Sequence, residues 1–141
     1  MVKKLKTAFI TGSEGFIGGY LSKILLNKYQ VIGGYYKKTK FKKLKGVKYV
    51  FCDVRNLDNI KKIFRKYKPS LVFHLAAKSH PFYSFTNPIE TMNTNVLGTI
   101  NLLETCKKDK LKPKIITACS SGQYGSRPFS QLPMAEQNEY D

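Results

Sequence analysis

The stretch TAFITGSEGFIG, residues 7–18, decides the fold of this 141-residue chain. Its first five residues are typical of a buried β-strand, and residues 16–27 carry apolar side chains at a helical period. Between them, Gly12 allows a tight turn, Gly15 allows close approach of a phosphate, and Gly18 allows the helix to pack close to the strand. Because a helix N-terminus directs free N–H groups at anions, the stretch predicts a dinucleotide pyrophosphate site rather than a turn needed only for packing.

Strand-like and helix-like runs alternate along the rest of the chain. The same patterns predict strands over 30–35, 47–51, 70–75 and 114–119, and a helix over 57–67. This alternation predicts an α/β fold: a doubly wound parallel sheet with strand order 3-2-1-4-5, covered on both faces. Residues 1–141 are expected to form one such domain, truncated before the last strands and the substrate domain.

A further helix is predicted to start after residue 86. Asn87 can cap it, Pro88 suits its first position, and Glu90 stands three residues after the cap. An apolar stripe follows, made of Met92, Val96, Ile100 and Leu103.

The composition limits the partners that the chain is expected to have. A net charge of +16 suggests an anionic partner, but the lysines are scattered and no nucleic-acid-binding motif accompanies them, so we expect none. No apolar run approaches the roughly 18 residues of a membrane helix, and no secretory signal is expected. Three cysteines without CxxC spacing predict neither a disulfide framework nor a metal site, which favours a cytoplasmic protein.

Several motifs, taken in order, resemble the extended branch of the short-chain dehydrogenase/reductase superfamily, which has a Rossmann-type fold and includes nucleotide-sugar epimerases and 4,6-dehydratases. The motifs are TGSEGFIG (11–18), Asp53-Val54, HLAA (74–77), NVLGT (95–99) and SSGQYG (120–125). The resemblance covers essentially the whole chain. It implies that NAD or NADP contacts Gly12, Ser13, Gly15, Phe16, Ile17, Gly18, Asp53, Val54, Leu75, Ala76, Ala77 and Asn95.

The choice of cofactor is predicted from the end of the second strand. NAD-binding proteins of this fold usually place an acid there, whereas this chain has Lys37 and Lys38 in that region. These lysines can pair with a 2′-phosphate, which favours NADP, with NAD as the alternative.

The resemblance also implies a catalytic role for Ser120, which would hydrogen-bond the reacting sugar hydroxyl, while Ser79 and Ser121 are candidate substrate contacts. His74 is interpreted as a packed strand residue rather than a catalyst. The Tyr and Lys of the family's mechanism are expected beyond Asp141, so these 141 residues alone are expected to be inactive.

Residues 91–125 look most like the GDP-mannose 4,6-dehydratase group. This likeness implies a nucleotide-sugar substrate, transient oxidation at C4 and a homo-oligomer at full length. However, no Glu follows Ser120, and such enzymes use one for elimination. A 4-epimerase, a 4-keto reductase and a non-catalytic NAD(P)-binding module therefore remain open alternatives.

Overall fold

A parallel five-stranded sheet forms the centre of the computed structural model, which describes residues 5–36 and 41–137. The order is β3-β2-β1-β4-β5, as predicted. The strands are β1 (Thr7–Thr11), β2 (Gln30–Tyr35), β3 (Lys48–Phe51), β4 (Leu71–His74) and β5 (Lys114–Thr117). Since all neighbouring pairs are parallel, the carboxyl ends of the strands meet at one edge of the sheet, where ligands of such folds bind.

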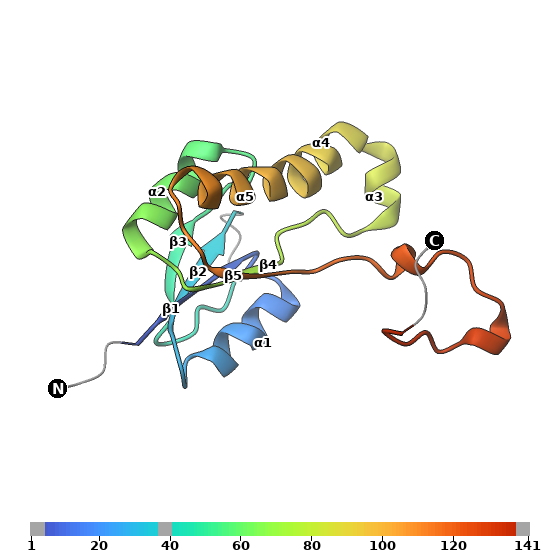
Figure 1. Cartoon of the computed structure of the whole chain (residues 1–141), viewed down its shortest axis with the longest axis horizontal. Helices are drawn as coiled ribbons and strands as arrows, with labels where there is room; N and C mark the ends of the chain where they lie inside the picture. Colours follow the sequence, from blue (N-terminus) through green and yellow to red (C-terminus); the bar gives the residue numbers. More distant parts are fainter. Residues whose placement is uncertain (1–4, 37–40, 138–141) are drawn as a thin grey trace.

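Helices cover both faces of this sheet (Figure 1). Helix α1 (Phe16–Leu25) lies on one face, and α2 (Leu57–Tyr67) and α5 (Gly98–Lys108) pack together on the other. Three short elements lead into α5: α3 (Pro81–Thr86), α4 (Pro88–Met92) and the π-helix η1 (Asn93–Leu97). After β5 the chain runs away from the sheet through the 3₁₀-helices η2 (Ser121–Tyr124) and η3 (Phe129–Gln131).

The main core lies between the sheet and the α2–α5 layer. Phe9 of β1 and Phe64 of α2 are fully buried and meet edge to face, with ring centroids 5.8 Å apart. Leu102 of α5 is buried in the same cluster. Asn56 caps α2 by accepting the Asn59 N–H, and Lys68 ends it in a left-handed conformation before Pro69.

The helix predicted after residue 86 differs from expectation in two respects. Asn87 makes no side-chain cap, and its amide nitrogen donates to the Thr86 hydroxyl. Glu90 does not return to the helix start, because its carboxylate pairs with Lys78 and accepts from Tyr83. Pro88 does occupy the start of α4.

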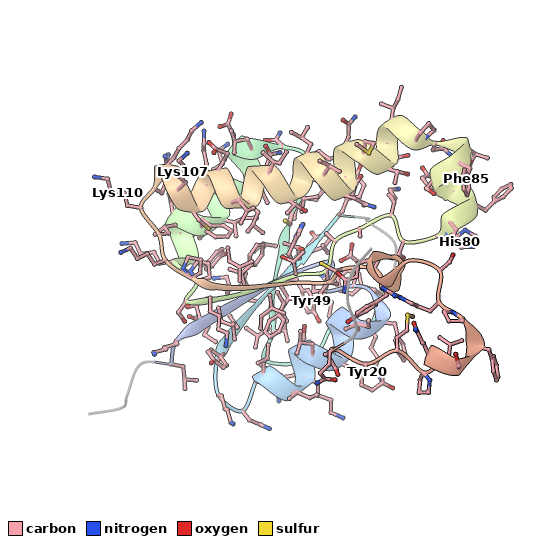
Figure 2. The ribbon with its side chains drawn as sticks, turned by 45° about the vertical axis from the view of Figure 1, so that its right-hand side comes forward. Tyr20, Tyr49, His80, Phe85, Lys107 and Lys110 are labelled. Carbon is pink, nitrogen blue, oxygen red and sulfur yellow. The ribbon has the colours of Figure 1, made fainter. Side chains whose placement is uncertain are left out.

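Apolar side chains on the outer helix faces remain exposed. Figure 2 shows Tyr20 on α1 and Phe85 on α3, and these side chains are 64% and 84% exposed. The stripe of Met92, Val96, Ile100 and Leu103 is also exposed. The inner face of α5 instead carries Gly98, Asn101, Leu102, Thr105 and Cys106. Small residues are needed there, since a Cβ at Gly98 would come within 2.7 Å of a Val54 methyl carbon. Within residues 5–36 and 41–137, no helix has the length and apolar character of a membrane span.

Candidate dinucleotide-binding site

A cavity of about 630 Å³ opens at the carboxyl edge of the sheet. It lies between the glycine loop after β1 and the segments that follow β2, β3, β4 and β5. Its lining includes most of the predicted cofactor residues: Gly12, Gly15, Phe16, Ile17, Gly18, Asp53, Val54, Leu75, Ala76 and Ala77, together with the predicted substrate residue Ser79.

The three glycines of the loop have distinct surroundings. Gly12 has a φ of +69°, and a Cβ there would also come within 3.0 Å of the Ala76 backbone nitrogen. A Cβ at Gly18 would lie 2.4 Å from the Gly12 carbonyl oxygen, so α1 packs on the loop only because this residue is glycine. A Cβ at Gly15 would meet one atom of the protein, at 3.2 Å, so the space beside Gly15 belongs to the cavity. Gly15 also begins α1 without a side-chain cap, which leaves helix N–H groups for a ligand.

The two residues between Gly12 and Gly15 hold the loop against β2. The Ser13 hydroxyl and backbone N–H both donate to the Gly34 carbonyl at 3.0 Å, and this side chain is buried away from the cavity lining. The Glu14 Oε1 atom accepts the Tyr36 N–H at 2.9 Å. Glu14 lines the cavity, and its second oxygen, Oε2, is buried without a hydrogen-bond partner.

Asp53 lies two residues after the end of β3, in a salt bridge with Arg55. The Arg55 Nε and one terminal nitrogen donate to the two carboxylate oxygens at 2.9 Å, which holds the pKa of Asp53 below its usual value. The same guanidinium stacks 4.8 Å from the centre of the Tyr36 ring. Next to Asp53, burial and the carboxylates of Asp53 and Glu14 raise the pKa of the Cys52 thiol to about 12, so this cavity thiol stays protonated and is not a nucleophile.

One buried hydroxyl links the end of β1 to the segment after β4, and both adjoin the cavity. The Thr11 Oγ1 atom accepts the N–H groups of Leu75 and Ala76 at 3.1 Å and lies 2.8 Å from His74 Nδ1. Since both of its lone pairs are used, its proton goes to Nδ1. His74 is therefore assigned as the neutral tautomer that donates from Nε2 to Thr99, consistent with burial lowering its pKa.

Asn95, in the π-helix, continues this network. Its amide accepts the Lys78 N–H at 2.8 Å and donates to the Lys78 carbonyl at 3.1 Å, so it clamps the segment after β4. The Thr99 hydroxyl, which accepts from His74, donates to the Asn95 carbonyl at 2.6 Å. Asn95 itself is not part of the cavity lining: its side chain positions the loop that is.

The remaining predicted residues are placed as follows. The Ser120 Oγ atom accepts the Gly122 N–H at 3.1 Å and caps η2, just beyond the lining residues Ala118 and Cys119. Ser121 lies in η2. Lys37 and Lys38 lie outside the described residues. In the part of the chain that the structure describes, no three His, Cys, Asp or Glu side chains cluster as a metal site would require.

Sequence reasoning missed several cavity residues. They include Glu14, Tyr36, Arg55, Lys78 and Thr94. The sequence contained a signal for Arg55, because a cation two residues after an Asp at a strand end can fold back and pair with that Asp. Glu14 had none, because its direction depends on an N–H that lies 22 residues later.

The fold, the glycine loop and the cavity together define a nucleotide-binding domain of the Rossmann type. A family model described as GDP-mannose 4,6 dehydratase matches residues 9–141, so the chain belongs to this family within the extended short-chain dehydrogenase/reductases.

The relatives include both epimerases and dehydratases. UDP-glucuronate 4-epimerase 2 of Arabidopsis thaliana is 31% identical over 96% of this chain and 33% of its own length. CDP-glucose 4,6-dehydratase of Salmonella typhimurium is 30% identical over 88% of this chain and 37% of its own. The solved structure of UDP-glucose 4-epimerase from Thermus thermophilus, in complex with NAD, has a TM-score of 0.80 at 30% identity, over 88% of this chain and 41% of its own. The chain thus spans between a third and about two fifths of these relatives.

Proposed function

We propose that this chain is the NAD(P)-binding part of a nucleotide-sugar epimerase or 4,6-dehydratase. The observation that carries the proposal is the glycine loop, whose Gly12 and Gly15 open onto the cavity at the uncapped start of α1. A dinucleotide fits these residues chemically, because free helix N–H groups suit a pyrophosphate and the absence of a Cβ at Gly15 allows close approach.

Each part of the cavity has a role in this proposal. The loop would bind the pyrophosphate, the Asp53 carboxylate and Val54 would contact the adenine, and the backbone of Leu75, Ala76 and Ala77 would support the rest of the cofactor. When bound, the nicotinamide supplies a reversible hydride acceptor. The chain's own contribution is to bind and orient it, with the Thr11–His74 network fixing the loop after β4.

A matched pair of substitutions tests the site. Gly15→Val places a branched side chain in the cavity, whereas Gly19→Val adds the same group one turn along α1, where a Cβ meets nothing within 4 Å. Binding of NADH and NADPH is measured by their fluorescence. The affinity is expected to fall at least tenfold in Gly15→Val and to stay unchanged in Gly19→Val, since a tenfold change corresponds to the loss of about 1.4 kcal/mol of binding free energy. Equal affinities of Gly15→Val and the unchanged chain would show that the loop is not the phosphate site.

Two observations favour different reactions for the longer protein. The matched family favours dehydration of GDP-mannose, whereas Ser121, Gly122 and Gln123 after Ser120 provide no carboxylate for elimination, which favours a 4-epimerase. Both reactions begin with oxidation at C4, where Ser120 would hydrogen-bond the reacting hydroxyl. The Tyr and Lys that complete such a site are expected in a longer protein.

Product analysis separates the two reactions. The longer protein would be incubated with GDP-mannose and with UDP- and dTDP-hexoses. A 4-keto-6-deoxy product supports the dehydratase, and a C4 epimer supports the epimerase. Ser120→Ala is expected to slow either reaction roughly 10²-fold, as loss of a positioned polar group does at a reacting oxygen. Full activity of this variant would exclude the role of Ser120.

A further inference from the structure

A carboxylate stands at the end of β2 although the sequence has no acid there. The Glu14 side chain, from the glycine loop, reaches across and accepts the N–H of Tyr36, the residue directly after β2. Its second oxygen, Oε2, is buried and unpaired. Buried carboxylate oxygens are normally hydrogen-bonded, so the protein leaves this one without its usual partner, and because Glu14 lines the cavity, a rotation of its carboxylate would offer that oxygen to a ligand donor.

The other charges on the described cavity lining are compensated. Asp53 pairs with Arg55 at 2.9 Å, and Lys78 pairs with Glu90 at 2.8 Å. Among the lining residues that the structure describes, Glu14 is thus the charged group without an ion-pair partner. The chain as a whole carries a net charge of +16, but this part of its cavity presents a negative group.

We infer that Glu14 determines cofactor specificity and selects a dinucleotide with a free ribose 2′-hydroxyl, NAD, over one with a 2′-phosphate. This inference rests on the proposed function. In this fold, an acid at the end of β2 accepts a hydrogen bond from the ribose hydroxyls of NAD, and Glu14 brings a carboxylate to that place from a different part of the sequence. The same carboxylate repels a phosphate, because two anions at hydrogen-bond distance in a partly enclosed site raise the free energy of binding. The preference is opposite to the one that Lys37 and Lys38 predict.

Calorimetric titration of the full chain with NAD and with NADP tests this assignment. Glu14→Gln keeps an oxygen for the Tyr36 N–H and removes the charge. Glu104→Gln is the matched control, because it changes the net charge equally at a surface pair with Lys108, on α5 and away from the cavity. A second variant, Glu14→Ala, removes both oxygens, and circular dichroism verifies that each variant is folded.

The expected result is tighter binding of NAD than of NADP by the unchanged chain. The ratio should fall roughly tenfold in Glu14→Gln and Glu14→Ala, the scale of one charge-assisted hydrogen bond, and stay constant in Glu104→Gln. Tighter binding of NADP by the unchanged chain, or an unaltered ratio in both Glu14 variants, overturns the inference and leaves the proposed function standing. Binding of neither cofactor overturns both.

Discussion

Replacing Thr11 by valine should destabilise the protein far more than the loss of one hydroxyl suggests. The Thr11 hydroxyl serves three partners at once, the N–H groups of Leu75 and Ala76 and the Nδ1 atom of His74, and the residue is fully buried. Valine has the same shape and leaves all three unpaired. Since each buried unpaired group costs about 1–3 kcal/mol, and Leu75 and Ala76 are half-buried and can reach water, we expect a loss of about 2–3 kcal/mol.

Thr105→Val is the matched control. Thr105 is also fully buried, but its hydroxyl donates only to the Asn101 carbonyl one helical turn before it. That carbonyl still accepts a backbone N–H in the variant, so the expected loss is below about 1 kcal/mol.

Urea unfolding, followed by far-ultraviolet circular dichroism, measures both variants. At roughly 3 °C per kcal/mol for a domain of this size, Thr11→Val should also lower the melting temperature by about 6–9 °C. Equal stabilities of the two variants would refute the argument that the Thr11 hydroxyl joins the two loops.

Two further predictions concern packing and pH. Gly18→Ala should destabilise the protein by about 1–3 kcal/mol, because its Cβ would lie 2.4 Å from a backbone oxygen. Gly19→Ala should instead stabilise it by up to about 1 kcal/mol, because a Cβ there meets open space and alanine has the better helix propensity. The same urea assay compares the two variants, and similar changes in stability would contradict the role of Gly18 in packing. Burial lowers the pKa of His74 below its ordinary value of 6.5, so the unfolded chain takes up a proton first and stability should decline as the pH falls from about 6.5 toward the lower folded-state pKa. Unfolding midpoints measured at intervals between pH 7.5 and 5 should show this decline in the unchanged chain and much less of it in His74→Gln, and an identical decline in both would assign it to other groups.

The sheet was predictable from the sequence because its strands are short apolar runs. The predicted bounds of the first two strands, 7–11 and 30–35, agree with β1 and β2, which are central and buried on both faces. The other three strands are shorter than predicted. β3 starts one residue later than the predicted 47–51 and ends as predicted, whereas β4 covers only 71–74 of the predicted 70–75 and β5 only 114–117 of the predicted 114–119. Edge and loop residues carry a weaker pattern, because partial exposure relaxes the demand for apolar side chains.

The part of the site that escaped prediction depends on contacts between distant residues. The π-helix over 93–97 is a change of hydrogen-bond register within a helical sequence, and apolar periodicity does not encode it. The direction of the Glu14 side chain depends on the Tyr36 N–H, and the pairing of Asp53 with Arg55 depends on the turn after β3. Glycine positions were informative because backbone conformation and close approach leave a local mark on the sequence.

A network of hydrogen bonds joins cavity-lining segments that lie far apart in the sequence. Thr11 immediately precedes the glycine loop, and Lys78 lies in the segment after β4, which also lines the cavity. The path between them runs through His74, Thr99 and Asn95, with each hydroxyl donating once and accepting at least once. From Thr11 through His74 to Thr99, the direction of each proton follows from the one before, so a charged imidazolium at His74 would force Nδ1 to donate to an oxygen whose lone pairs are already used. The neutral His74 side chain thus joins Thr11, which also binds the segment after β4, to Thr99 of α5, so a substitution at His74 is expected to affect both stability and cofactor binding.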